Sequence, residues 1–494
     1  MQSQDIKPSK PQDVHIVENN ELSIIEALFP VLVLVLMLFY NVFIVFGDDA
    51  LSGSNQFILL LGAAVAAVVG FFNKVSYKQM LDEVAENLKS TAGALLILLM
   101  VGALAGTWLI SGIIPTMIYY GLQILNPTFF LVACVLICAI ISIATGSSWT
   151  TSATVGIALI GIGETLGISL GMTAGAVLSG AYFGDKMSPL SDTTNLAPAM
   201  AGADLFDHIK YMAITTVPTF TITLILFLII GLNIDVLGSP DITDKLLAID
   251  GAFNISPWLF AVPLLVVGLI VKKTPPLVAL LVGTLLAGIA AIIAQPQIVM
   301  QIAGTETLNF QSAYKGVMQS ITVDTAVETT SAELNDLFSA GGMKGMLGTI
   351  WLIICAMVFG GVMDAIGALS RISKALISLA QSTFGLFAST VASCLALNVT
   401  ASDQYLALVV PGKMFKKAYD DRNLAPENLS RTLEDSGTVT SVLIPWNTCG
   451  AYQSGVLGVS VADYFLYAFF NWISPFMTLL VAGFAIKIKQ IKAS

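Results

Sequence analysis

Charged side chains are scarce in this chain of 494 residues. Only 11% of its residues are Asp, Glu, Lys or Arg, whereas soluble globular domains carry roughly 25%. Hydrophobic residues make up 56% of the chain, and the mean hydropathy is +0.85. These values exclude an ordinary soluble domain and indicate a protein that crosses a membrane several times.

Residues that commonly carry enzyme chemistry are also few. The chain has two histidines, His15 in the polar amino-terminal tail and His208. It contains no P-loop, no zinc-binding histidine pair and no nucleophile elbow. All five cysteines lie in or beside apolar stretches, where packing is their ordinary role. The sequence therefore disfavours an enzyme and predicts neither a cofactor nor a structural metal.

Positive charge is not in excess either. The net charge is −10, so no basic surface for nucleic acid is expected. Much of the surplus acid lies in one segment, residues 305–337, away from the expected membrane ends. The first twenty residues are polar and mixed in charge, so we expect no cleaved signal peptide and a retained first helix over 24–46.

Apolar runs of spanning length divide the chain into two similar halves. They occur at 24–46, 56–72, 91–110 and 211–233, and again at 257–271, 275–294, 345–366 and 464–486. Between the third and last run of each half lies a stretch too long for one helix and too polar for plain lipid contact, at 128–203 and 381–460. Each is predicted to form a hairpin followed by an interrupted helix.

A polar motif recurs in the two halves. The sequence TGSS at 145–148 and the sequence TASD at 400–403 are offset by 255 residues. The same offset separates three glycine pairs, Gly93 and Gly348, Gly106 and Gly361, and Gly112 and Gly367. This spacing indicates a duplication. It predicts a first repeat over 23–240 and a second over 250–487, with an acidic external insert around 300–340 and tails at 1–22 and 488–494.

The positions of lysine and arginine predict the orientation of the repeats, because these residues mark cytoplasmic loops. Lys74, Lys78 and Lys89 follow the second span, and three lysines follow the last span, so both termini are predicted to be cytoplasmic. Each half then makes five crossings plus a re-entrant hairpin. An odd number of crossings gives the halves opposite orientations. The alternative is twelve to fourteen ordinary helices whose similarity reflects shared composition.

The sequence GDKMSPLSDTTN at 184–195 cannot remain helical, because Pro189 removes a donor and three ionisable residues share the stretch. Non-helical backbone at membrane depth is tolerated only where it lines protein or a wet cavity. A corresponding break, IPWNTCG at 444–450, has neutral oxygens only. We expect the two breaks and the hairpin turns to coordinate a small cation through these residues: Thr145, Ser147, Ser148, Ser188, Thr193, Asn195, Asn398, Thr400, Ser402, Asn447 and Thr448.

Four carboxylates in apolar surroundings are candidate binding sites for a cation or a proton, because ionisable residues within membranes are rare and costly. They are Asp185, Asp192, Asp403 and Asp364. Sodium is expected at Asp192, Thr193 and Asp403. Two alternatives remain open: Asp403 caps the next helix, and Asp364 lies near the interface.

Other charged residues are expected to have structural roles. Glu164, Glu434 and Asp435 border predicted helix ends, where solvated or capping side chains are usual. Lys186 is expected to neutralise its neighbour Asp185 or to extend toward the interface.

Four stretches are long enough to be characteristic of a family: GDKMSPLSDTT at 184–194, DQY at 403–405 with PG at 411–412, LSRTLEDSGT at 429–438, and PWNTCG at 445–450. They resemble the NhaC-type sodium/proton antiporter family, which also includes sodium-coupled malate/lactate antiporters. The resemblance covers about residues 25–486, while the acidic insert departs from a compact member. It implies secondary transport without ATP in a prokaryotic cytoplasmic membrane. It also implies kinship with ion transporters in which hairpins and broken helices slide against a scaffold, often in a homodimer.

The expected protein is thus an all-α polytopic membrane protein with two inverted repeats, whose partners are the lipid bilayer, sodium and protons. A carboxylate among Asp185, Asp192 and Asp403 would bind sodium and a proton in turn, and an elevator-like movement would carry the occupied site across. One alternative is sodium-coupled exchange of a small carboxylate, bound at half-helix amino termini at 147–150 and 447–450. A passive cation channel is disfavoured, and a structural or receptor protein leaves the buried carboxylates unexplained.

Overall fold

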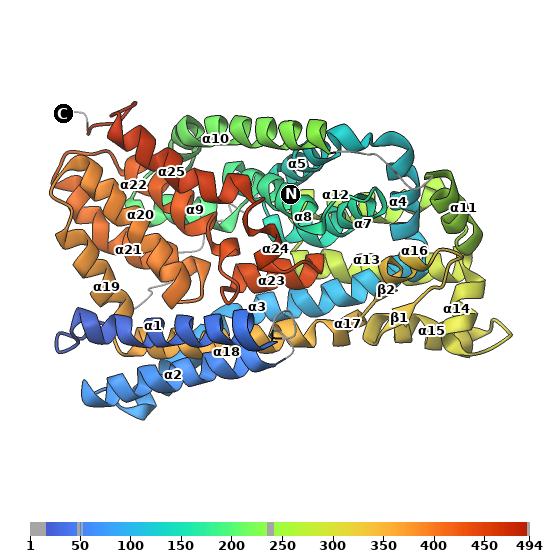
Figure 1. Cartoon of the computed structure of the whole chain (residues 1–494), viewed down its shortest axis with the longest axis horizontal. Helices are drawn as coiled ribbons and strands as arrows, with labels where there is room; N and C mark the ends of the chain where they lie inside the picture. Colours follow the sequence, from blue (N-terminus) through green and yellow to red (C-terminus); the bar gives the residue numbers. More distant parts are fainter. Residues whose placement is uncertain (1–15, 47–49, 51–52, 235–241, 492–494) are drawn as a thin grey trace, which may run out of the picture.

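The computed structural model describes residues 16–46, 50, 53–234 and 242–491, which form a predominantly helical molecule (Figure 1). Residues 1–15 of the predicted amino-terminal tail and residues 492–494 of the predicted carboxy-terminal tail lie outside the described residues. The elements of the first half are α1 (Ile24–Tyr40), the π-helix η1 (Asn41–Phe46), α2 (Ser54–Phe72), α3 (Tyr77–Ile110), α4 (Ile113–Ile124), α5 (Pro127–Thr145), α6 (Ser148–Thr151), the π-helix η3 (Ser152–Gly156), α7 (Ile157–Thr165), α8 (Leu170–Met187), α9 (Asp192–Ala201) and α10 (Leu205–Asn233).

The second half repeats much of this order and adds a small β-hairpin, in which Thr325 pairs with Ala340. Its elements are α11 (Ile242–Ala252), the 3-10 helix η4 (Pro257–Phe260), α12 (Ala261–Val271), α13 (Pro276–Ala294), α14 (Pro296–Ala303), α15 (Phe310–Thr322), β1 (Thr325–Ala326), α16 (Ala332–Leu337), β2 (Ser339–Ala340), α17 (Gly342–Gly345), α18 (Leu347–Ala365), α19 (Ala368–Ser378), α20 (Thr383–Thr400), α21 (Gln404–Asp420), α22 (Pro426–Leu433), the π-helix η5 (Glu434–Thr438), the 3-10 helix η6 (Ser441–Leu443), α23 (Thr448–Leu457), α24 (Val461–Phe465) and α25 (Phe469–Gly483).

Eight helices of the described chain are long and apolar enough to cross a membrane. Helices α11 and α12 form a further apolar pair, bent by 82° at a short break, which has the form of either a broken span or a re-entrant loop. The expected span at 464–486 is divided into α24 and α25, and α25 has only 15 residues. The run at 91–110 is the end of a 34-residue helix, α3. The multi-pass membrane architecture predicted from the composition is therefore present.

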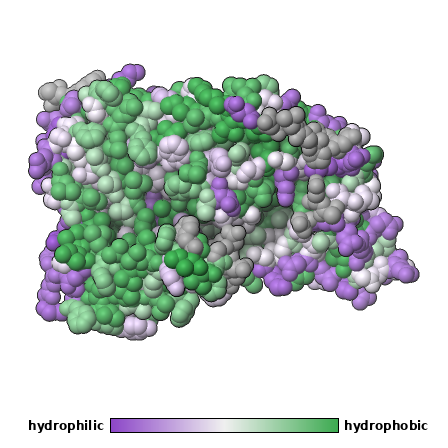
Figure 2. All heavy atoms as spheres, in the orientation of Figure 1, coloured by the Kyte–Doolittle hydropathy of each residue, from purple (hydrophilic) through white to green (hydrophobic). Residues whose placement is uncertain are grey.

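Hydrophobic side chains cover most of the face shown in Figure 2, while hydrophilic ones gather toward the two ends of the long axis. The helices α1, α2 and α18 run along that axis, and α2 packs against both α1 and α18 (Figure 1). The acidic insert is folded as α14 to α16 with the β-hairpin, at one end of the molecule. This distribution is the one expected when helices cross a bilayer along the long axis.

Some matching positions of the two halves have matching backbone conformations. Gly112 and Gly367 precede α4 and α19 with φ of 79° and 78°. Each hairpin turn contains one residue of positive φ, Gly146 at 70° and Ser402 at 58°. A left-handed conformation is uncommon for a residue other than glycine. The left-handed residue of the second turn lies one position later than the 255-residue offset predicts, because Ala401, the counterpart of Gly146, has a φ of −85°.

The interrupted helix of the first half packs against the hairpin through small residues. Helices α5 and α8 lie side by side, and a Cβ atom at Gly180 would lie 2.2 Å from the carbonyl oxygen of Val135. At Gly184 the corresponding distance to the oxygen of Ala139 is 2.6 Å. Close backbone approach through glycine is a usual way for membrane helices to associate.

The variant Gly180→Ala tests this contact. The added methyl group would force α5 and α8 apart, and we expect a loss of about 1–3 kcal/mol of stability. The measurement is the thermal unfolding midpoint of the purified protein in detergent. Gly268→Ala is the matched control, because no atom lies within 4 Å of the added Cβ. Equal midpoints for the two variants would contradict the contact.

Candidate functional site

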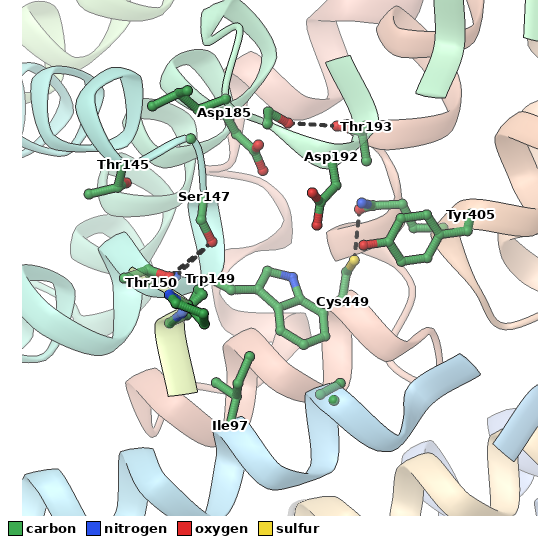
Figure 3. A pocket seen from close by; sticks show the side chains of 18 of the residues that line it. Ile97, Thr145, Ser147, Trp149, Thr150, Asp185, Asp192, Thr193, Tyr405 and Cys449 are labelled. Carbon is green, nitrogen blue, oxygen red and sulfur yellow. Dashed lines mark hydrogen bonds between the residues drawn. The ribbon is translucent and has the colours of Figure 1, made fainter. Parts of the chain in front are cut away.

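A cavity of about 590 Å³ lies where the hairpin turns meet the two helix breaks. One wall comes from the turn at 145–150 and the break at 185–193, and another from 403–405 with Thr448 and Cys449. The remaining wall comes from α3 and from the loop between α12 and α13. Segments more than 250 residues apart in sequence therefore surround one polar space (Figure 3).

Asp185 fixes the first hairpin turn to the first broken helix. It lies in the last turn of α8 and is 7% exposed. Its Oδ2 accepts hydrogen bonds from the Ser148 amide at 3.2 Å and from the Ser148 hydroxyl at 2.6 Å. Two donors on one oxygen stabilise an ionised carboxylate. Asp185 therefore connects the hairpin turn to the broken helix and is also part of the polar cavity wall.

Asp192 is the carboxylate most open to the cavity. It begins α9, just after the N-cap residue Ser191, and its side chain is exposed. Figure 3 shows it pointing into the space between Asp185 and Tyr405. Its position at a helix amino terminus favours the negative charge.

Asp403 caps α21, so the capping alternative is correct. Its Oδ1 accepts hydrogen bonds from the amides of Tyr405 at 2.8 Å and Leu406 at 3.0 Å. The residue also lines the cavity. The cap uses only Oδ1, and the Thr448 side chain of the second break also interacts with this carboxylate.

The second break is held by amide side chains. Asn447 caps α23, and its Nδ2 donates to the main-chain oxygen of Asn398 at 3.1 Å. Asn398 in turn donates to Gly437 and Thr440 of the interrupted helix. These amides satisfy backbone groups that the break leaves free.

The structure brings together some of the residues expected from sequence. Those that line the cavity are Asp185, Asp192, Asp403, Thr145, Ser147, Thr193 and Thr448. Those that lie in the surrounding turns and breaks without lining it are Ser148, Ser188, Asn195, Asn398, Thr400, Ser402 and Asn447. Asp364 lies apart from them, 8% exposed near the end of α18.

Two expectations about charged residues are wrong. Lys186 does not pair with Asp185; it forms an ion pair with Asp435, and both side chains are fully buried. Successive helical residues point about 100° apart, so Lys186 faces the second half while Asp185 faces the hairpin. Glu434 and Asp435 are not solvated at a helix end, because the π-helix η5 that contains them is buried.

Several cavity residues were not expected from sequence. Trp149 lines the cavity and stacks on Tyr452 with ring centroids 3.9 Å apart. Ser90 and Thr91 of α3, and Lys273 before α13, form the opposite wall. Trp149 could have been predicted, because it follows directly after the polar residues of the hairpin turn. Ser90, Thr91 and Lys273 could not, because no spacing in the sequence shows which helix packs opposite the breaks.

Among the described residues, no group of three or more His, Cys, Asp and Glu side chains could hold a metal ion. The three carboxylates that line the cavity therefore do not form a cluster of metal ligands.

Comparison with known proteins gives consistent matches. A model of the Na+/H+ antiporter family matches residues 180–486. The Na+/H+ antiporter NhaC of Alkalihalophilus pseudofirmus is 40% identical over 422 residues, 85% of this chain and 88% of that protein. NhaC of Bacillus subtilis is 35% identical over 87% of this chain and 92% of that protein. The malate-2H+/Na+-lactate antiporter of Bacillus subtilis is 36% identical over 85% and 86%.

The ion pair between Lys186 and Asp435 can be tested by a double-mutant cycle. Lys186→Met leaves the Asp435 charge buried without its cation, and we expect a loss of about 3–5 kcal/mol of stability. The double variant Lys186→Met with Asp435→Leu should recover much of this loss. The measurement is thermal unfolding in detergent. A double variant less stable than the single one would contradict the pairing.

Proposed function

Because the chain belongs to the Na+/H+ antiporter family, we propose that it exchanges sodium ions for protons across the cytoplasmic membrane of a prokaryotic cell. The observation that carries this proposal is one cavity lined by Asp185 and Asp192 of the first helix break and by Asp403 of the second hairpin turn. Such a protein is a secondary transporter and needs no cofactor, since sodium and protons are its transported ions.

We infer that Asp192 and Asp403 hold the sodium ion. Asp192 is open to the cavity, and Asp403 keeps Oδ2 outside its helix cap. Oxygens of the polar wall, among them the hydroxyl of Thr448, would complete the coordination. When sodium leaves, a proton neutralises the same carboxylates, so the two ions compete for one site.

We infer that alternating access uses two inverted repeats, residues 23–240 and 250–487. Support comes from the matched glycines at Gly112 and Gly367, which have the same left-handed conformation before α4 and α19. The broken helices and hairpins would move as one unit against α3, α12 and α13, which form the far wall of the cavity. An elevator-like movement of this unit would carry the occupied site across the membrane.

The present arrangement corresponds to an inward-facing state in this proposal. The wall of the cavity includes Ser90, next to Lys89, and Lys273, next to Lys272. Lysines in short loops favour the cytoplasmic side. Both termini would then be cytoplasmic and the folded acidic insert external. Dimer formation is part of the proposal only by analogy with related transporters.

A second candidate function is sodium-coupled exchange of a small organic acid. The observation that favours it is Lys273, which is the one cation among the described residues that line the cavity. An ammonium group there could bind a substrate carboxylate. One relative is named a malate-2H+/Na+-lactate antiporter, so both substrates need to be tested.

Asp192→Asn tests the antiporter in proteoliposomes that contain a pH-sensitive dye and an imposed proton gradient. Sodium alone should cause proton efflux from wild-type vesicles, and the variant should lose about tenfold or more of the rate, because its neutral side chain no longer exchanges a proton for the ion. Asp204→Asn is the control. Asp204 caps α10 outside the cavity, and asparagine caps as well as aspartate.

Loss of proton efflux in Asp192→Asn together with normal efflux in Asp204→Asn supports an ion-binding role for Asp192. Normal efflux in Asp192→Asn means that this carboxylate does not carry the exchange.

Lys273→Gln tests the second candidate in the same vesicles, with malate or lactate added. An organic acid bound by Lys273 should show a KM about tenfold higher in the variant, while exchange on sodium alone should not change. If neither acid affects the wild-type protein, the organic-acid function is wrong.

A further inference from the structure

A second group of charged residues lies behind the cavity, on the interrupted helix of the second half. Arg431 belongs to α22, and Glu434 and Asp435 begin the π-helix η5. All three side chains are fully buried. Short π-helical segments often occur at functional sites, and the proposed exchange assigns no role to this one.

Glu434 differs from Asp435 because its carboxylate forms no ion pair among the described residues. Asp435 binds Lys186 and accepts a hydrogen bond from the Thr478 hydroxyl. Neither oxygen of Glu434 has a hydrogen bond of normal geometry in the described chain, although the hydroxyls of Thr438 and Thr193 lie near enough to weaken the cost of its charge. An ionised carboxylate buried without a donor is costly. A bound proton removes that cost.

The ionised form of Glu434 is favoured by Lys186, which lies within electrostatic reach of it. Arg431 lies three residues earlier in the same buried segment. Its guanidinium keeps its charge at all accessible pH values and lies 4.6 Å from the centre of the Tyr211 ring. None of its three nitrogens has a hydrogen-bond partner among the described residues. Glu434 is therefore a buried group for which both the neutral and the charged form are supported.

The surroundings of η5 contain few other charges. Helix α8 contributes Asp185 and Lys186, both within electrostatic reach of Glu434, and α9 contributes Asp192 at its first position. Helices α20 and α25 contain no charged residue, and α21 meets η5 at its uncharged part, near Ala407. From α10, His208 contacts Ser430. The field at Glu434 thus depends mainly on the cavity and on the Lys186 pair.

We propose that Glu434 is a proton-binding site behind the cavity, and that sodium entering the cavity expels its proton. The positive ion held by Asp192 and Asp403 favours the charged form of Glu434, so a carboxylic acid plus a sodium ion become a carboxylate, a bound sodium ion and a released proton. The ions would be coupled through space without sharing every ligand. This inference rests on the proposed exchange function.

The test compares two transport modes of proteoliposomes for wild type and Glu434→Gln. One mode is sodium-driven proton efflux, and the other is exchange of ²²Na+ for unlabelled sodium without a pH gradient. Glutamine keeps the shape but cannot release a proton. We expect Glu434→Gln to lose about tenfold or more of the proton efflux and to retain sodium/sodium exchange within about threefold.

Glu427→Gln is the matched control on the same helix. Glu427 is also buried, but it pairs with Lys489 and lies away from the cavity. This variant should resemble wild type in both modes. If wild-type vesicles show no sodium-driven proton efflux, the exchange function itself fails, which is a different result from failure of the Glu434 site alone.

Three results would overturn the proton site while leaving the exchange function intact. They are unchanged proton efflux in Glu434→Gln, loss of both modes in a folded variant, and equal losses in Glu427→Gln. If Glu434→Gln does not fold, the pH dependence of exchange is measured instead for Glu434→Asp. A displaced pH profile of exchange in that variant supports the proton site, and a profile identical to wild type contradicts it.

Discussion

Backbone amides and carbonyls that leave a helix inside a bilayer have no water to bind, so each must find a partner within the protein. At the first break, the Ser188 hydroxyl donates to the carbonyl of Ile143, and the Asn195 amide donates to that of Pro189. At the second break, Asn447 donates to Asn398. These partners come from the hairpins or from the breaks themselves. Hairpin turns and broken helices therefore form one unit around a polar space.

Buried charge joins the halves of that unit. Lys186 belongs to the first broken helix and Asp435 to the second, and neither side chain is exposed. Separating the two helices would leave two unpaired charges in an apolar interior, at a cost far above that of breaking an exposed pair. The pair therefore favours movement of both broken helices together, as an elevator-like mechanism requires. The same rigidity would keep Asp185 and Asp192 at a constant distance from the second half.

The features predicted correctly from sequence depend on local chemistry. Apolar runs predicted the spans, and Pro189 with its polar neighbours predicted a break whose carboxylates line the cavity. The partner of Lys186 could not be predicted, because it depends on which way one residue of a helix faces. The burial of Glu434 was missed for a similar reason, since a short polar helix looks exposed until other helices cover it. The wall formed by Lys273 and α3 depends on tertiary packing alone.

In the proposed function, sodium and protons displace one another within this buried polar unit. The most direct measurement uses purified wild-type protein in detergent, in weakly buffered solution with a pH-sensitive dye, to which sodium chloride or choline chloride is added. Competition predicts that sodium releases protons in proportion to the ion bound, and that choline releases none. Sodium binding without proton release would contradict the account.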